Sequence, residues 1–452
     1  MDQAVIGVDI GSSRIKAIAY DRDGRAMRDV AVPTPLRRHG DVLDFPVLDM
    51  VATAREALAA VARGSHVMGI GIASMGEVGT IVSGGSLAAI DFPSWHDSRG
   101  DSVIRRLSSL AETLDAHTAT GGHFRTVSTV AKLAWLADQR AIDSGMFLTV
   151  ASALAWTLTG DATQDMSLAV TSGVTNPLNG RHLDELWAAA GLQGILLAPV
   201  ANAGTAAPIA AERTVEGLLP GSIPVVVAGH DHPVAAVGTG APRDAVIDSL
   251  GTGEPLIAPF AGAHVVRRAR VAPFPPEGFS IEASPSTGDP IAIAEGLRPG
   301  LAMSALLAAS GTSRAELDAR VDLDCDTTLD AGDVAALESG VVTIPADHRS
   351  WSALHASFVA RAADAERAVR ELTGVQGPTV LTGGGLRSTA WVKMKQRAAS
   401  GPVLVSTATE TAARGAAALA GVAAQWWDSP EGMPGAALVS VDAWLARSSS
   451  GA

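Results

Sequence analysis

The chain has a single cysteine, Cys325, in 452 residues, which excludes an internal disulfide and any cysteine-based zinc cluster. It has no charge-free apolar run of about 18 residues, so a membrane span is not expected. It also lacks basic runs, and its net charge of -13 argues against nucleic acid as the main partner. The first residues, MDQAVIGVDIGSS, lack the pattern of a signal peptide, so the cytoplasm is the expected compartment.

Three widespread catalytic motifs are missing as well. There is no Gly-Lys dipeptide and therefore no P-loop, and neither a His-Glu-x-x-His helix nor a Gly-x-Ser-x-Gly elbow is present. What the chain does contain is a set of glycine-rich turns that follow apolar runs, with a few acids beside them. Any chemistry predicted from the sequence has to be built from these turns and acids.

The composition is that of a globular protein, with 47% hydrophobic and 18% charged residues. A chain of 452 residues is too long for one ordinary hydrophobic core, so we expect two domains. One pattern supports this expectation because it occurs twice. Residues 4–10 and 14–20 read as strands around a turn at Gly11, and the same arrangement returns around Gly251. A duplication would place two similar domains face to face with a phosphate between their turns, although two unrelated hairpins would give the same pattern.

Elsewhere, the spacing of apolar residues predicts longer elements. Residues 48–62 and 349–372 have the spacing of amphipathic helices, and residues 67–73 read as a strand. Residues 378–391, PTVLTGGGLRSTAW, read as a strand, a triple-glycine turn and the start of a helix.

The middle of the chain, residues 223–242, reads as a buried strand, a short turn and a helix with Pro233 in its first turn. Its last residues, 238–242, are the candidate hinge between domains. We therefore expect an α/β protein with a first domain at residues 1–240 and a second at residues 241–452.

The turn at Gly11 is a candidate phosphate site. Glycine lets the backbone come close to a ligand, and the amides around Ser12 and Ser13 could surround phosphate oxygens. Asp9, at the end of the preceding strand, could hold Mg²⁺ together with those oxygens. An ordinary turn with a capping aspartate is the alternative. The same interpretation applies to the second turn, which contains Gly251, Thr252 and Gly253.

Asp231 is the candidate general base. It follows a predicted buried strand, at the sheet edge where α/β folds bind ligands, and it could accept the proton of an attacking hydroxyl. A helix N-cap is the alternative role for this residue. His230 and His232 suggest a metal pair, but no third ligand is evident.

Five segments add a resemblance to a known family. They are residues 9–16 (DIGSSRIK), 95–99 (WHDSR), 129–139 (TVAKLAWLADQ), 158–169 (with Leu158-Thr159-Gly160, Asp165, Ser167 and Ala169) and 383–391 (GGGLRSTAW). In this order, and over nearly the whole chain, they resemble the motifs of the FGGY carbohydrate kinase family.

The resemblance implies two actin-like, ribonuclease H-like domains with ATP and sugar in the cleft between them. It implies Asp231 as the base and Asp9 and Asp231 near Mg²⁺. The residues implied around the phosphates are Gly11, Ser12, Ser13, Lys16, Gly251, Thr252 and Gly253. Those implied near the adenosine are Gly383, Gly384, Gly385, Leu386 and Ser388. Those implied around the substrate are Gly76, Glu77, Trp95, Asp97, Asp231 and His232.

The chain departs from the family pattern mainly at the substrate. Residues 74–79, SMGEVG, stand where many xylulose kinases have Gln-Met-His-Gly. Glu77 matches the acid that glycerol kinases use on hydroxyls, yet Gly76 replaces their arginine and Val127 their tyrosine, which suggests a roomier pocket. Glu77 as a solvated loop acid, and Asp97 with Arg99 as a structural salt bridge, stay open as alternatives. Gly253 replaces a serine usual in the second phosphate turn.

We therefore expect an ATP- and Mg²⁺-dependent kinase that phosphorylates a primary hydroxyl of a neutral sugar or polyol. Its partner would be that small molecule rather than a nucleic acid or a membrane, and it could form a homodimer. Two alternatives use the same fold without catalysis, namely a nucleotide-dependent regulator and a sugar-binding pseudokinase.

Overall fold

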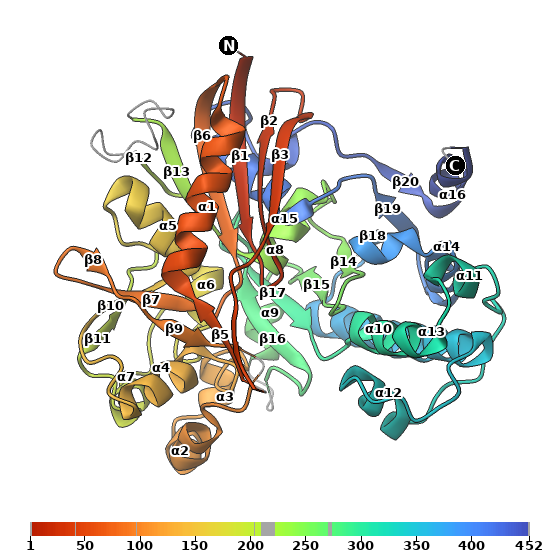
Figure 1. The fold of residues 1–452 in the computed structure, drawn as a ribbon, viewed down its shortest axis with the longest axis horizontal. Coiled ribbons are helices and arrows are strands. Elements are labelled where there is room, and N and C mark those ends of the chain that lie inside the picture. The colour runs from red at the N-terminus through yellow and green to blue at the C-terminus, as the bar shows by residue number, and fades with distance from the viewer. Residues whose placement is uncertain are drawn as a thin grey trace.

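The fold consists of two large β-sheets that lie beside each other, each covered by helices. The computed structural model describes residues 2–40, 42–95, 97–202, 204–208, 222–269 and 274–450, so His96 lies outside the described residues. The first sheet comes from the first half of the chain and the second sheet from the second half. In Figure 1 the first sheet lies at the upper left and centre, and the second sheet runs from the centre to the right. This arrangement confirms the α/β fold class.

The strands of the described residues form four sheets, and each sheet is given below with its strands in spatial order. The six-stranded sheet is β12 (Ala206–Pro208), β13 (Pro224–His230), β6 (Ser65–Ser74), β1 (Asp2–Ile10), β2 (Arg14–Tyr20) and β3 (Ala26–Pro33). The seven-stranded sheet is β16 (Phe279–Ala283), β17 (Pro290–Ala294), β15 (Leu256–Pro259), β14 (Val246–Ser249), β18 (Thr379–Thr382), β19 (Val403–Ser406) and β20 (Leu438–Ser440). The four-stranded sheet is β11 (Ile195–Leu197), β10 (Gly145–Thr149), β7 (Gly79–Ser83) and β8 (Ser86–Leu87). The three-stranded sheet is β4 (Arg37–His39), β5 (Val42–Pro46) and β9 (Asp91–Pro93).

The helices have the following bounds. In the first half they are α1 (Val47–Ala62), α2 (Asp101–Thr113), α3 (Ala116–Ala119), α4 (Thr129–Asp138), α5 (Val150–Thr159), α6 (Met166–Val170), α7 (Asp184–Ala189) and α8 (Asp231–Gly238). In the second half they are α9 (His264–Arg268), α10 (Pro299–Ser310), α11 (Arg314–Asp318), α12 (Ala331–Glu338), α13 (His348–Thr373), α14 (Thr389–Ala398), α15 (Thr411–Ala423) and α16 (Val441–Ser450), with 3₁₀ turns η2 (Gly384–Arg387) and η3 (Pro430–Gly432). Within the described part of the chain, no helix combines the length and the apolar character that crossing a membrane requires.

The two large sheets share one strand arrangement. In the first, β1 pairs antiparallel with β2 and parallel with β6, and β6 pairs parallel with β13. In the second, β14 pairs antiparallel with β15 and parallel with β18, and β18 pairs parallel with β19. Each sheet thus contains a hairpin beside two parallel strands, which is what a duplication predicts.

Strand β1 is buried on both faces, and alternate residues contact different helices. Ile6 and Val8 belong to the main core of the first half, to which α1 contributes. Val5 instead packs with alanines of α15, a helix from the far end of the chain. Figure 1 shows this blue helix lying against the red strands. The boundary between residues 240 and 241 stays a prediction, since α15 contacts the first sheet.

Helix α15 lies very close to the first sheet because glycines leave room for its backbone. A methyl group at Gly7 would overlap the carbonyl of Ala413, and one at Gly71 would overlap the carbonyl of Ala416. Backbone contact of this kind is possible only without a side chain on the strand. The sheet and α15 therefore fix each other's position.

Most elements expected from the sequence are present. The predicted helices correspond to α1 and α13, the predicted strand 67–73 lies within β6, and the triple-glycine turn lies between β18 and α14. Pro233 is in the first turn of α8, as predicted. One alternative was wrong. Asp231 is the first residue of α8 and the N-cap is His230, so Asp231 is not an N-cap.

We predict that Gly71→Ala lowers the free energy of unfolding by roughly 1–3 kcal/mol, because an added methyl forces α15 away from a packed surface. Thermal and urea unfolding would measure the loss. Gly401→Ala is the matched control, since a methyl there meets nothing within 4 Å. Equal stability of the two variants would contradict the close-packing argument.

Candidate active site

The first glycine turn, between β1 and β2, is closed by its own backbone. The amide of Gly11 donates to the carbonyl of Arg14 at 3.0 Å, and the Thr34 hydroxyl donates to the carbonyl of Gly11 at 2.7 Å. The amides of Ser12 and Ser13 make no hydrogen bond to another described residue. Two neighbouring amides without a protein partner are available to anionic oxygens.

This turn lines a cavity of about 290 Å³ together with two carboxylates. Asp9 is at the end of β1 and Asp231 directly follows β13. Both strands pair in parallel with β6, so their carboxyl ends meet at one edge of the sheet, where α/β folds bind ligands. The other lining residues are Gly11, Ser12, Ser13, Arg14, Lys16, His232, Ala235 and Ala412.

The carboxylate of Asp9 lies in an unfavourable electrostatic environment. Asp9 is only 8% exposed, and its burial, together with the negative charge of Asp231, raises its pKa to about 7, although the charge of Lys16 acts in the opposite direction. The Lys16 ammonium lies 3.9 Å from Asp9 Oδ2 and 2.5 Å from Glu410 Oε2, so it is shared between two acids. Lys16 therefore compensates Asp9 only in part.

A divalent cation fits this pair of acids. Oδ1 of Asp9 and Oδ1 of Asp231 are both buried and have no hydrogen-bond partner. Mg²⁺ commonly uses one or two carboxylates and takes its remaining ligands from phosphate and water. Among the described residues, no group of three His, Cys, Asp or Glu converges on one point, so the His230 and His232 pair has no third ligand there.

His230 connects the base candidate to the second half of the chain. Its Nδ1 lies 3.0 Å from Glu282 Oε2, on β16, and its Nε2 lies 3.4 Å from Asp231 Oδ1. Burial disfavours the charged imidazole, but Glu282 and Asp231 outweigh it and raise the pKa of His230 to about 10. His230 therefore places a positive charge between Glu282 and Asp231.

Asp165 and Ser167 hold the backbone that carries Asp231. The Ser167 hydroxyl donates to Asp165 Oδ1 at 2.5 Å and accepts from the amide of His230 at 2.9 Å. Gly229, with φ +128°, is required here because a Cβ would lie 2.5 Å from Ser167 Oγ. Asp165 and Ser167 belong to the segment 158–169 that resembles a family motif. Their hydrogen bonds position the backbone at His230, directly before Asp231.

Glu77 lies in a charged environment rather than in solvent. It is partly buried, burial raises its pKa, and the charges of His230 and Arg125 oppose that effect. Arg125 pairs with Glu295 through both terminal nitrogens, one of them at 3.0 Å from Oε1, and Ser280 donates to the same carboxylate. Glu77 therefore faces a set of groups from both halves of the chain.

The expectation of a roomier pocket beside Glu77 was wrong for Gly76. A Cβ at Gly76 would overlap the methyl group of Thr171, so the space left by the missing side chain is already filled. Gly76 is needed for packing against α6 and its following residues, and it does not enlarge the site. Val127 is half-buried.

Asp97 belongs to an ion-pair network. Its carboxylate accepts from Nε of Arg99 at 2.8 Å, and the fully buried Lys132 donates to its backbone carbonyl at 2.7 Å. Arg99 also reaches Asp44 at 2.6 Å. This geometry favours the structural salt bridge for Asp97, and a contact of Asp97 or Trp95 with substrate stays a prediction.

The two glycine turns of the second half lie directly against each other. The amide of Leu250 donates to the carbonyl of Thr382, and the amide of Gly385 donates to the carbonyl of Leu250, both at 2.8 Å. A Cβ at Gly383 would lie 2.6 Å from that same carbonyl. The predicted phosphate turn at 251–253 and the predicted adenosine turn at 383–385 thus form one surface.

The residues of these turns differ in how accessible they are to a ligand. Gly383, Gly384 and Thr252 are exposed, and Leu386 is half-buried. Ser388 is fully buried and its hydroxyl caps α14 by accepting from the amide of Trp391, which favours a structural role. Its contact with a nucleotide stays a prediction.

Sequence reasoning missed the acids and bases that come from neighbouring elements, namely Glu282, Arg125 and Glu295. One signal was available for Glu282, because it is an acid in a strand whose other residues, apart from Ser280, are apolar, and a buried charge of that kind usually has a partner. Nothing in the sequence pairs Arg125 with Glu295, since they are 170 residues apart.

Comparison with known proteins places this geometry in a family. The model for the N-terminal domain of the FGGY family of carbohydrate kinases matches residues 4–238, which include the first glycine turn and Asp231. The chain belongs to the FGGY family of carbohydrate kinases. An L-fuculokinase from Salmonella typhi is 28% identical to this FGGY-family chain over 272 residues, which cover 57% of each sequence. The match thus spans little more than half of that relative.

Solved structures extend the likeness to the whole fold. A xylulose kinase from Rhodospirillum rubrum superposes with a TM-score of 0.79 over 96% of this chain and 93% of its own, at 18% identity. A glycerol kinase from Plasmodium falciparum, determined with ADP, gives 0.77 over 97% and 94%, at 14% identity. At these identities the likeness concerns the fold, and it confirms the two-domain actin-like architecture.

We predict that Asp9→Asn raises the melting temperature at pH 8 in the absence of divalent cations. The pKa of Asp9 is raised from 3.8 to about 7. The stability that the proton of Asp9 contributes to the folded state is therefore fully present below pH 3.8 and is lost as the pH rises through 7. The amide avoids this loss, which is of the order of a few kcal/mol.

Calorimetry at pH 5 and pH 8 would show the difference growing with pH. The exposed acid Asp326 provides the control, because Asp326→Asn should change little at either pH. Mg·ATP should stabilise the wild type more than Asp9→Asn. If Asp9→Asn melts below the wild type at pH 8, the conclusion that Lys16 compensates Asp9 only in part is wrong.

Proposed function

We propose that this protein transfers the γ-phosphoryl group of ATP to a primary hydroxyl of a neutral sugar or polyol. The observation that carries the proposal is the placement of Asp231. Its carboxylate lines the same cavity as the first glycine turn, and its Oδ1 has no hydrogen-bond partner. A base beside a phosphate turn, in a chain of the carbohydrate kinase family, has the arrangement that phosphoryl transfer to an alcohol needs.

In the proposed reaction, Asp231 accepts the proton of the substrate hydroxyl as that oxygen attacks the γ-phosphorus and ADP leaves. His230 lies beside the carboxylate of Asp231, and Ser167 fixes the backbone that carries Asp231. Asp9 and Asp231 are the residues that would hold Mg²⁺, which would neutralise charge on the phosphates. The amides of Ser12 and Ser13 and the ammonium of Lys16 would bind phosphate oxygens.

The nucleotide would extend from this cavity toward the second half of the chain. The accessible backbone at Gly251, Thr252 and Gly253 would meet the phosphates, and Gly383 and Gly384 the adenosine. A side chain at Gly253 would be accepted, because a Cβ would lie at an ordinary contact distance of 3.6 Å from the carbonyl of Leu297. The missing serine at this position therefore removes one hydroxyl and leaves the backbone of the turn unchanged.

Glu77, Asp231 and His232 would contact the substrate hydroxyls, with Trp95 and Gly76 in the walls. A partly buried carboxylate that accepts hydroxyl protons suits a neutral polyhydroxylated molecule better than an anionic one. ATP and Mg²⁺ as cofactors, the cytoplasm as compartment and a homodimer belong to the same proposal. No observation favours the non-catalytic regulator or the pseudokinase.

A panel of sugars and polyols in an ADP-release assay tests the function directly. L-Fuculose, xylulose and glycerol come first because of the names that the similar proteins carry. ADP release that no member of a broad panel stimulates over the ATP-only rate would contradict the proposal.

With an acceptor in hand, we predict that Asp231→Asn reduces kcat by roughly 10²–10⁴ while nucleotide affinity stays within a few-fold of wild type. The amide keeps the shape of the side chain but cannot take the proton. Steady-state rates and nucleotide titration of both proteins measure the two effects. Near-normal turnover would remove Asp231 from the mechanism.

We also predict that Glu77→Gln raises KM for the acceptor roughly ten- to a hundredfold, with a smaller effect on KM for ATP. The reason is the loss of a charge-assisted hydrogen bond of about 1.5–3 kcal/mol. Glu112→Gln, at an exposed position of α2, serves as the control. An unchanged acceptor KM in Glu77→Gln would leave Glu77 without a role in binding.

A further inference from the structure

A second group of buried charges lies next to the glycine turns of the second half. Asp248 is in β14, Glu254 follows the 251–253 turn, and Lys395 is in α14. Their exposed fractions are 2%, 1% and 7%. We call these three residues the buried triad.

The buried triad has more acids than bases. The ammonium of Lys395 donates to Asp248 Oδ2 at 2.6 Å and to Glu254 Oε1. The other two oxygens, Asp248 Oδ1 and Glu254 Oε2, are buried and have no hydrogen-bond partner. Two carboxylates and one ammonium leave one uncompensated negative charge, which is costly where water cannot reach it.

A proton on Glu254 removes this charge. Burial raises the pKa of Glu254, Lys395 opposes that effect, and the neighbouring carboxylate of Asp248 raises the pKa again, to about 8. Lys395 of α14 and Asp248 of β14 are the charged groups that act on Glu254 from the elements packed around it. With that proton in place, the triad has no net charge.

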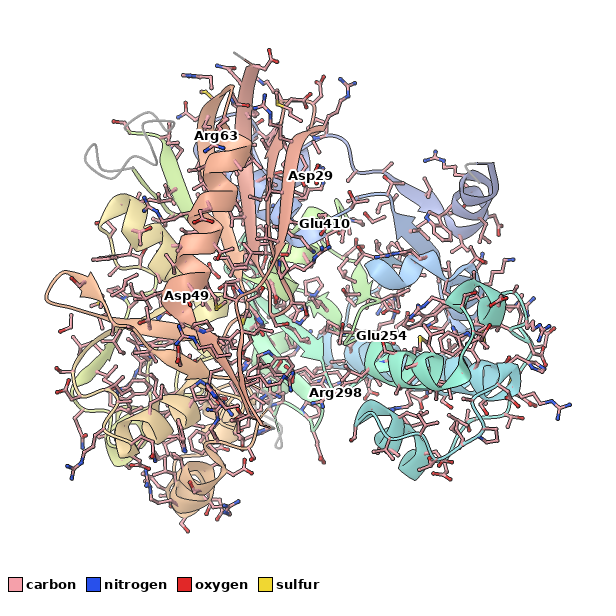
Figure 2. All side chains as sticks on the ribbon, in the orientation of Figure 1. Asp29, Asp49, Arg63, Glu254, Arg298 and Glu410 are labelled. Carbon is pink, nitrogen blue, oxygen red and sulfur yellow. The ribbon has the colours of Figure 1, made fainter. Side chains whose placement is uncertain are left out.

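The buried triad is connected to both turns through close contacts and through the chain. The amide of Glu254 donates to the carbonyl of Leu297 at 2.9 Å, two residues before α10 begins. Within α10, a Cβ at Gly300 would lie 2.5 Å from the carbonyl of Gly251. Lys395 is in the helix that begins directly after the triple-glycine turn. In Figure 2, Glu254 is on the side of the second half that faces the first.

We propose that the buried triad is a proton-coupled positioning device for the nucleotide. With the proton present, Lys395 holds α14 against β14, so that the turns at 251–253 and 383–385 keep the spacing that a nucleotide needs. With the proton lost, a net negative charge appears behind the turn that receives the phosphates and repels them. Glu254 and Lys395 are positioning residues, because they act through the turns. The proposal rests on the proposed function.

Proton linkage gives the expected size of the effect. If the bound state requires a protonated Glu254, affinity for Mg·ATP falls by up to tenfold for each pH unit above about 8. Glutamine at position 254 imitates the protonated acid, so Glu254→Gln should bind with little pH dependence over the same range. A merely structural role for Glu254 would not create this difference in pH dependence.

Calorimetric titration with Mg·ATP at pH 7.5, 8.5 and 9.5 tests the proposal on the full chain. Wild type should lose roughly tenfold or more in affinity over this range, and Glu254→Gln should change at most two- to threefold. Glu371→Gln, at an exposed position of α13, should follow the wild type. Equal pH dependence in wild type and Glu254→Gln would overturn the coupling.

Two further measurements keep the test decisive. If Glu254→Gln does not fold, titration of the wild type in buffers of different ionisation enthalpy counts protons directly. Uptake approaching one proton at pH 9.5 supports the proposal, and no uptake overturns it.

Melting without nucleotide then tests the protonation of Glu254 independently of nucleotide binding. Because the pKa of Glu254 is raised from 4.5 to about 8, the stability that its proton contributes is lost as the pH rises through 8, and the melting temperature of wild type should fall relative to Glu254→Gln.

Absence of nucleotide binding at every pH would overturn both the proposed function and the coupling. A pH-dependent melting difference together with normal, pH-independent binding would overturn the coupling alone.

Discussion

Close contact between backbones is the constraint on which the rest of this structure depends. Helix α15 can reach the first sheet because Gly7 and Gly71 have no side chains, and the two turns of the second half can touch because Gly383 and Gly385 have none. The contacts of Gly7 and Gly71 with α15 hold β1 and β6, and β6 pairs with β13. Asp9 lies at the end of β1 and Asp231 directly follows β13, so their positions depend on these contacts. The cavity between these acids is a consequence of how tightly the surrounding backbone packs.

The position of α15 has a further consequence for the relation between the two halves. This helix belongs to the second half by sequence, yet its alanines pack with Val5 and Ile18 of the first sheet, and Ala412 lines the cavity. Glu410, directly before α15, pairs with Lys16. A change in the relative position of the halves would therefore reach the phosphate turn through α15 as well as through any hinge at residues 238–242.

The sequence predicted the elements whose signals are local. Glycine turns after apolar strands, the helical spacing of residues 349–372 and the Gly-His-Asp segment can be recognised because neighbouring residues carry the pattern. Ion pairs such as Glu282 with His230 could not be predicted, since their partners come together only in the folded chain. The mistake at Gly76 has the same origin, because only the structure shows that Thr171 fills the space beside it.

Both halves have an acid before a glycine turn, but the two acids have different surroundings. Each half ends its first strand near a glycine turn with a buried acid, Asp9 before Gly11 and Asp248 before Gly251. Asp9 is open to a cavity and is only partly compensated by Lys16, so its charge is available to a cation from outside. Asp248 is enclosed and bound to Lys395, so its charge is compensated from within. The difference follows from the residue that faces each acid. Each lysine is shared with a second acid, but Lys16 is partly exposed and Lys395 is buried. The partly exposed lysine leaves its acid able to bind a ligand, whereas the buried lysine makes its acid part of the scaffold.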